Sequence, residues 1–201
     1  MNAELWLSAF YHLFLSLLGT LLGGSIGLLL GLAAYRYRRT AAALLSVTEV
    51  IQTIPHLAML ALLLLVFGLG NATLVAALAL YAILPILQNT LLAFRQIDPV
   101  YLNIGRGMGM TRWQLFAKVE FPLAFTAILT GVRIALVTSI GIAAIGVFVG
   151  ADGLGRTIYR GLQTMNTGSV LMGAAAVCGL VIVSEIAIRG AASRFRTNQK
   201  Q

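Results

Sequence analysis

The sequence predicts an all-α membrane protein with five transmembrane helices. Of its 201 residues, 59% are hydrophobic and only 10% are charged, and the mean hydropathy is +0.92. A soluble globular domain is about 45–50% apolar and about 25% charged, so this composition excludes a soluble fold. Because a bilayer-spanning helix needs about 20 apolar residues, long uncharged runs mark the spans. The length suits one transmembrane domain over residues 1–201.

The charged residues divide the chain into the expected helices. The uncharged run 5–35 contains the first helix. The run 50–94 is about twice the length of a span, and the turn-forming segment FGLGNAT at 67–73 interrupts it, so it predicts two helices. The expected spans are about 11–35, 46–68, 72–94, 123–149 and 167–189, and a loop, 95–122, separates the third from the fourth.

The distribution of Lys and Arg predicts the orientation. Eleven of the fourteen cations lie in three segments that five spans place on one side of the membrane. They are Arg36, Arg38, Arg39, Arg95, Arg106, Arg112, Lys118, Arg189, Arg194, Arg196 and Lys200. The other side carries only Arg156 and Arg160. Because cytoplasmic loops are enriched in Lys and Arg, we expect the N-terminus outside and the C-terminus in the cytoplasm. The net charge of +8 therefore indicates orientation and not nucleic-acid binding.

The first expected helix carries a glycine every four residues, at Gly19, Gly23, Gly27 and Gly31. Such a ridge lets two membrane helices approach closely. The alternative is coincidence in a chain with 21 glycines. The ridge predicts helix packing and no chemistry.

Several kinds of site are not expected. Cys178 is the single cysteine, which excludes an internal disulfide and a cysteine-based metal site. Metal-ligating residues do not cluster at suitable spacing, so we expect no metal. Gly105, Gly107 and Gly109 alternate, but a phosphate-binding loop would follow a strand and continue into Gly-Lys-Ser/Thr. The N-terminus lacks the basic region and cleavage site of a removable signal peptide.

The loop segment NIGRGMGMTRWQLFAKVEFPLA, residues 103–124, is the longest polar interruption in the chain. Its pattern predicts a short helix-turn-helix, and Pro122 is suited to the first turn of the next helix. The pattern alone fits equally well an amphipathic loop on the membrane surface.

This segment resembles the EAA loop of binding-protein-dependent ABC importer permeases. Gly109 takes the glycine position of that motif, and Val119, Phe121 and Pro122 take its aliphatic, apolar and proline positions at the same spacing. Residues 103–105 are Asn-Ile-Gly where the family has Glu-Ala-Ala. The GMGMT sequence is similar to permeases that import glycine betaine, carnitine or choline.

The resemblance covers roughly residues 10–190. Segments 50–70, 80–90 and 131–155 resemble the second, third and fourth helices of the osmoprotectant branch, with Asp152 where relatives carry glycine. The resemblance implies a type I ABC importer permease with a methionine-permease-like bundle, in a bacterial-type cytoplasmic membrane. An amino acid such as methionine is an alternative cargo. An ion-coupled carrier is a further alternative, but it would tend to show intramembrane acids and an internal repeat.

The resemblance also implies how the chain is powered. The 95–122 loop would be a cytoplasmic coupling loop whose 103–122 part contacts a separate ATPase, which would bind ATP and Mg²⁺; this chain would bind no cofactor and catalyse no covalent chemistry. Implied partners are a second permease copy or related chain, two ATP-binding subunits, an extracytoplasmic substrate-binding protein and the lipid bilayer. The expected coupling residues are Arg106, Gly107, Met108, Gly109, Met110, Thr111, Arg112, Trp113, Lys118 and Pro122.

Polar residues inside the spans are candidates for a translocation path. They are Gln52, Thr53, His56, Gln88, Asn89 and Arg133. For each uncharged member, a hydrogen bond between helices, at about 0.6 kcal/mol, is the favoured explanation. Arg133 either faces the path or reaches toward the membrane edge. Residues 150–166 are too long and polar for a plain turn, and we expect a short surface helix there that meets a delivery protein or caps the path.

Overall fold

The computed structural model describes residues 2–198, and side chains from Glu4 to Gly190. Within that range every regular element is helical, which confirms the all-α prediction. The elements are α1 (Asn2–Ala34), α2 (Arg38–Thr53), α3 (His56–Phe67), α4 (Asn71–Arg95), α5 (Pro99–Gly107), α6 (Arg112–Leu115), a π-helical turn (Phe116–Glu120), α7 (Phe121–Ala143), a 3₁₀ turn (Ala144–Val149), α8 (Gly155–Gln163) and α9 (Thr167–Asn198). The side chains of Arg194 and Arg196, and all of Lys200, lie outside the described part.

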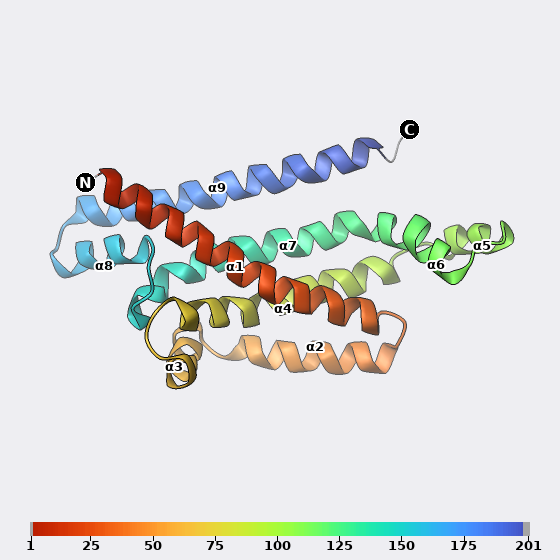
Figure 1. Ribbon diagram of the computed structural model, residues 1–201, viewed down its shortest axis with the longest axis horizontal. Helices are drawn as coiled ribbons and strands as arrows, with labels where there is room; N and C mark the ends of the chain where they lie inside the picture. Colours follow the sequence, from red (N-terminus) through yellow and green to blue (C-terminus); the bar gives the residue numbers. More distant parts are fainter. Residues whose placement is uncertain (1, 199–201) are drawn as a thin grey trace.

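The long helices run side by side and leave two distinct ends (Figure 1). At one end α1 leads into α2, and α4 leads through α5 and α6 into α7; we call this the basic end. It carries Arg36, Arg38, Arg39, Arg95, Arg106, Arg112 and Lys118. At the opposite end the chain passes from α7 through α8 into α9; we call this the α8 end (Figure 1).

Helix α4 forms the centre of the bundle, and its packing against α1 depends on the glycine ridge. Leu74, Leu78 and Leu87 of α4 have no exposed surface. A Cβ added at Gly23 would lie 1.9 Å from the Ala79 carbonyl oxygen, and one at Gly27 would lie 2.6 Å from that of Ile83. The two backbones are therefore in direct contact, which confirms that the ridge serves close helix packing.

Within residues 2–198, four helical stretches are long and apolar enough to cross a membrane, and a bent helix pair adds a fifth crossing if it counts as one span. That pair corrects the expected single helix 46–68. It consists of α2 and α3, bent by 97°. Pro55 lacks an N–H and disfavours helical geometry at Ile54, whose ψ is 124°.

The break is held by α4. The Tyr81 hydroxyl donates to the Ile54 carbonyl at 2.6 Å, and the Gln52 amide donates to the Tyr81 carbonyl at 2.9 Å. The first bond satisfies the Ile54 carbonyl, which the break frees. The second satisfies the Tyr81 carbonyl, which has no intrahelical donor because Pro85 lies four residues later. The break is thus part of the packed structure.

The other helix boundaries also differ from the expected ones. α1 begins at Asn2 and not near residue 11, and α9 continues to Asn198. The expected fourth span, 123–149, is α-helical from Phe121 to Ala143 and then tightens into the 3₁₀ turn. Hydropathy marks only the stretch inside the bilayer, so it misses helix that continues beyond it.

Candidate functional site

The segment between α4 and α7, residues 99–120, forms a compact helical projection at the basic end (Figure 1). Asp98 starts α5, because its carboxylate accepts from the Val100 backbone N–H at 2.9 Å and Pro99 occupies the first turn. Thr111 and Gln114 start α6 with a reciprocal capping box. We call residues 99–120 the α5–α6 segment.

The α5–α6 segment presents large apolar side chains and cations on its surface. Trp113 is 74% exposed and Met108 is 71% exposed. Arg106, Gly107, Thr111, Arg112 and Lys118 are also exposed, whereas Met110 and Pro122 are half-buried. Exposed aromatic and Met side chains bordered by arginine are typical of a protein contact surface. The structure thus brings the expected coupling residues onto one projection, except Pro122, which lies in the first turn of α7, and their role stays a prediction.

Gly109 forms the turn between α5 and α6 with a φ of 77°, and a Cβ there would meet no other atom. The constraint is therefore the backbone conformation alone. We expect Gly109→Val to distort the turn, since a β-branched residue in the left-handed region costs roughly 1–3 kcal/mol. Gly109→Asn is the matched control, because Asn tolerates this region.

The readout is the amount of ATP-binding subunit, the partner that the resemblance to importer permeases implies, that co-purifies with the chain. Val should reduce it strongly and Asn only slightly. Equal losses from both variants would show that any side chain at this position, and not backbone strain, is what the surface excludes.

Four of the six polar residues expected along a translocation path form hydrogen bonds or ion pairs with other groups of the chain. Gln52 is bonded to Tyr81 as described, the Thr53 hydroxyl donates to the Val50 carbonyl at 2.7 Å, and the Asn89 amide donates to the Pro85 carbonyl at 2.7 Å. Only the Gln52 bond joins two helices and favours the helix-packing interpretation; the Thr53 and Asn89 bonds lie within α2 and α4, and the role of these two residues stays a prediction. His56 is exposed with its ring centroid 4.4 Å from that of Tyr81, and Gln88 is exposed.

Arg133, the fourth, is paired across two helices. Its Nε donates to Glu185 Oε2 of α9 at 2.6 Å, and its Nη2 lies 2.5 Å from Oε1. Arg189, one turn further along α9, also reaches Oε1, at 2.9 Å. The ion pair explains Arg133 without a cargo contact.

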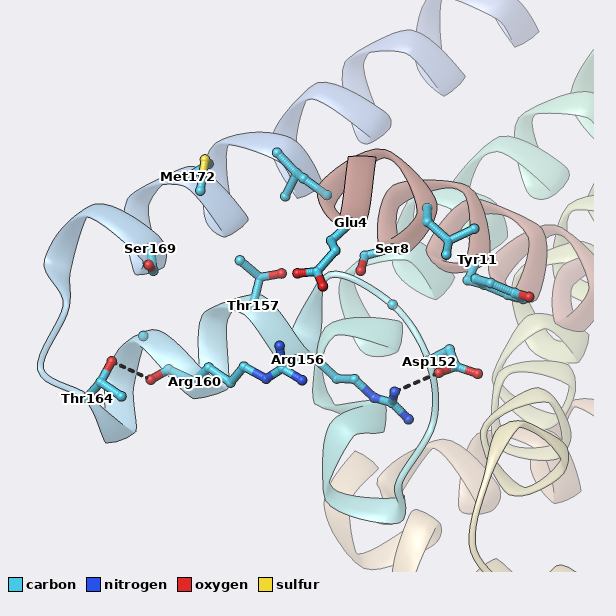
Figure 2. A pocket seen from close by; sticks show the side chains of 14 residues that line it. Glu4, Ser8, Tyr11, Asp152, Arg156, Thr157, Arg160, Thr164, Ser169 and Met172 are labelled. Atoms are coloured by element: carbon cyan, nitrogen blue, oxygen red, sulfur yellow. Dashed lines mark hydrogen bonds and ion pairs between the residues drawn. The ribbon is translucent and has the colours of Figure 1, made fainter. Parts of the chain in front are cut away.

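A polar pocket of about 340 Å³ opens at the α8 end (Figure 2). It is lined by Glu4 and Tyr11 of α1, by Arg156 and Arg160 of α8, and by the start of α9. The expected short helix within 150–166 is α8, so that prediction is confirmed.

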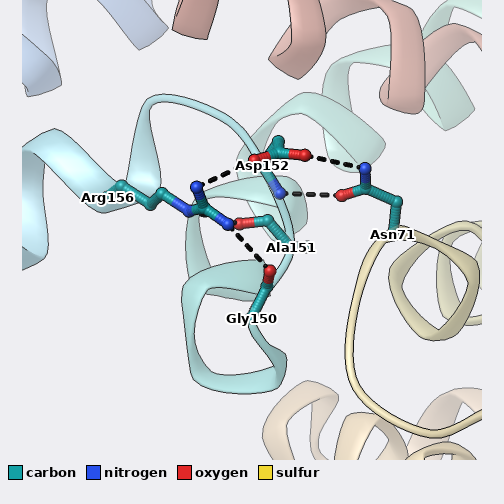
Figure 3. A network of polar contacts seen from close by, with 5 residues as sticks. All are labelled: Asn71, Gly150, Ala151, Asp152 and Arg156. Atoms are coloured by element: carbon teal, nitrogen blue, oxygen red, sulfur yellow. Dashed lines mark hydrogen bonds and ion pairs between the residues drawn. The ribbon is translucent and has the colours of Figure 1, made fainter.

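The loop before α8 is fixed to the start of α4 (Figure 3). The Asn71 amide donates to Asp152 Oδ2 at 2.9 Å and its oxygen accepts from the Asp152 backbone N–H at 2.7 Å. Arg156 pairs with Asp152 Oδ1 at 2.9 Å and donates to the carbonyls of Gly150 and Ala151. Asp152 is thus the centre of a network.

Two buried ionisable residues escaped the sequence analysis. His12 has no exposed surface, and its Nε2 lies 2.9 Å from the Ile140 carbonyl oxygen of α7. Glu120 is 7% exposed and accepts from the Tyr35 hydroxyl at 2.8 Å. An ionisable residue close to an apolar run was the available signal in both cases.

Comparison with known proteins places this arrangement among transporters. The family model described as "Binding-protein-dependent transport system inner membrane component" matches residues 19–197. The glycine betaine/carnitine/choline transport system permease protein OpuCD of Bacillus subtilis is 45% identical over 187 residues, covering 92% of this chain and 82% of that protein. The choline transport system permease protein OpuBD of the same organism is 46% identical, covering 82% and 73%.

Two further similarities agree. The carnitine transport permease protein OpuCD of Listeria monocytogenes is 44% identical over 176 residues, covering 87% of this chain and 79% of that protein. A solved structure of the MetNI methionine ABC transporter, in an inward-facing conformation, superposes with a TM-score of 0.82 at 22% identity, covering 97% of this chain and 99% of that chain. At that identity the likeness shows the fold alone.

Proposed function

Since the chain belongs to the family of inner membrane components of binding-protein-dependent transport systems, it is a multi-pass permease subunit of an ABC importer, and we propose that its cargo is a quaternary-ammonium osmoprotectant. Glycine betaine, carnitine and choline are the candidates. The supporting observation is the 44–46% identity to permeases named for these compounds. The methionine transporter is only 22% identical, which makes methionine the weaker candidate.

The energy would come from a separate ATPase docked on the α5–α6 segment. Trp113 and Met108 offer apolar anchors there, and Arg106, Arg112 and Lys118 offer charges for acidic groups. Aromatic and arginine side chains are frequent hot spots at interfaces. ATP and Mg²⁺ would bind to that partner, and this chain would hold neither. The cations of the basic end favour its lying in the cytoplasm.

Two further partners complete the proposal. A second permease, identical or related, would cover exposed span surface, because only 11% of the apolar stretch of α9 is buried within the described part of the chain. A substrate-binding protein would dock at the α8 end, where Glu4 and Arg160 line an open polar pocket. Selectivity would then reside largely in that protein.

The test is uptake of labelled glycine betaine, carnitine, choline and methionine into vesicles that hold the complex with its co-purified partners. We expect ATP-dependent accumulation of at least one of the first three. Trp113→Ala should lower both co-purified ATPase and uptake by roughly five-fold, the effect of losing one interface anchor. Tyr37→Ala is the control, because Tyr37 is an exposed aromatic residue at the same end but outside the α5–α6 segment.

The possible outcomes separate the parts of the proposal. ATP-driven uptake of methionine alone would overturn the cargo and leave the importer intact. Uptake that does not depend on ATP would contradict the mechanism itself. Equal effects of Trp113→Ala and Tyr37→Ala would contradict docking on the α5–α6 segment.

A further inference from the structure

Glu120 is the one charged side chain that is buried among residues 4–190. It ends the π-helical turn, Phe116–Glu120, that joins α6 to α7. A π-helical turn contains an extra residue, which rotates every later residue of the helix to a different side. Such turns occur frequently at functional sites. Glu120 therefore lies at the turn that determines which side of α7 is directed toward the α5–α6 segment.

The partners of Glu120 come from the end of α1. The Tyr35 hydroxyl donates to Glu120 Oε2 at 2.8 Å, and Arg36 Nη2 lies 3.4 Å from the same oxygen. Arg36 Nε also donates to the Tyr35 hydroxyl oxygen at 2.7 Å. Burial, together with Glu120, raises the pKa of Tyr35, so its hydroxyl remains a donor at neutral pH. Three residues thus form a closed network between α1 and α7.

Aromatic rings continue this network to the exposed surface. Tyr35 packs on Phe94 with ring centroids 4.4 Å apart, and Phe94 stacks on Phe116 at 6.0 Å. Phe116 in turn lies 5.6 Å from the exposed Trp113. A continuous set of packed groups therefore runs from the proposed docking surface to the end of α1.

The aromatic contacts and the hydrogen bonds of Glu120 differ in how well they transmit movement from one helix to another. Ring faces can slide over one another at small cost, whereas charge-assisted hydrogen bonds are directional and roughly twice as strong as neutral ones. The carboxylate of Glu120 thus supplies the directional contact between the end of α1 and the start of α7, beside the apolar cluster in which Leu32 and Ala124 take part.

We propose that Glu120 is a positioning residue that locks the end of α1 to the α5–α6 segment, so that movement of this segment shifts α1 together with α7. This role rests on the proposed docking of an ATPase on the same segment. Glu120 is buried and touches Tyr35 and Arg36, so its function is to transmit movement and not to contact the ATPase.

The experiment measures ATP hydrolysis and cargo uptake in the same vesicles, with the complete complex. Glu120→Gln removes the charge at nearly constant shape, and Tyr35→Phe removes only the hydroxyl. We expect co-purified ATPase to stay near the wild-type amount. Cargo moved per ATP should fall by roughly five-fold in Glu120→Gln, at the low end of typical couplings between sites. The effect of Tyr35→Phe should be smaller and in the same direction.

Two controls complete the design. Glu49→Gln makes the same change at an exposed carboxylate of α2 and should leave cargo per ATP unchanged. The double variant Tyr35→Phe/Glu120→Gln should be no worse than Glu120→Gln alone, because the two residues act in one network. A purely structural role would lower the melting temperature and the yield without changing the ratio.

A wild-type ratio in both Glu120→Gln and Tyr35→Phe would overturn the inference. So would loss of co-purified ATPase in Glu120→Gln at an unchanged melting temperature, since the carboxylate would then belong to the docking surface. Where Glu120→Gln fails to assemble, Tyr35→Phe decides. If Trp113→Ala behaves like wild type, the proposed docking of the ATPase is wrong. If Trp113→Ala lowers co-purified ATPase but the Glu120 and Tyr35 variants move a normal amount of cargo per ATP, only the proposed role of Glu120 is wrong.

Discussion

Gly23→Ala is expected to separate α1 from α4 and to destabilise the whole bundle. The added methyl group would lie 1.9 Å from the carbonyl oxygen of Ala79 and 2.7 Å from its carbonyl carbon. Both atoms are backbone, so no side-chain rotation can relieve the clash. Overpacking costs typically 1–3 kcal/mol, and we expect about 3 kcal/mol because two helices must move as units. The melting temperature in detergent should fall by roughly 6–12 °C.

Gly141→Ala is the matched control for this prediction. Gly141 also lies within a long helix, α7, but a Cβ there meets nothing within 4 Å. Alanine should be neutral or stabilise slightly, because it loses less backbone freedom than glycine on folding. If both variants have the melting temperature of the wild type, the close backbone contact between α1 and α4 is wrong.

Glu185→Gln is expected to be far more damaging than Arg133→Gln, although each removes one half of the same ion pair. Without the Glu185 carboxylate, Arg133 loses both oxygens that it contacts, inside a stretch apolar enough to span the membrane. Without Arg133, Glu185 still has Arg189 at 2.9 Å. An unpaired charge in a span is costly, whereas a remaining partner limits the loss.

The measurement is the yield of monodisperse protein extracted from membranes, together with its melting temperature. Glu185→Gln should lower the yield by roughly five-fold or more, because arginine is strongly disfavoured at membrane depth. The double variant Arg133→Gln/Glu185→Gln should recover much of the loss, since no charge of the pair then remains. A double variant that is worse than Glu185→Gln would show that Arg133 has another role.

The features that follow local sequence patterns could be predicted. Hydropathy located the apolar spans, and the four-residue spacing of glycines identified the surface of α1 that meets α4. Each depends on residues within a few turns of one another. The all-α fold of an ABC importer permease was therefore within reach of the sequence, and the comparisons confirm the family.

The pairing of polar side chains could not be predicted in the same way. His12 meets Ile140, 128 residues away, and Tyr35 meets Glu120, 85 residues away. Sequence patterns record which residues share a helix face, but not which side chain of another helix lies opposite. For that reason the sequence marks Arg133 as unusual but does not indicate that Glu185 is its partner.

The break between α2 and α3 also bears on how the chain enters the membrane during synthesis. α3 has 12 residues and is about 18 Å long, too short to cross a hydrocarbon core of about 30 Å. The bonds that hold the break come from Tyr81 in α4. We therefore expect this crossing to be completed only after the ribosome has released α4, with the second and third crossings entering the bilayer as one hairpin.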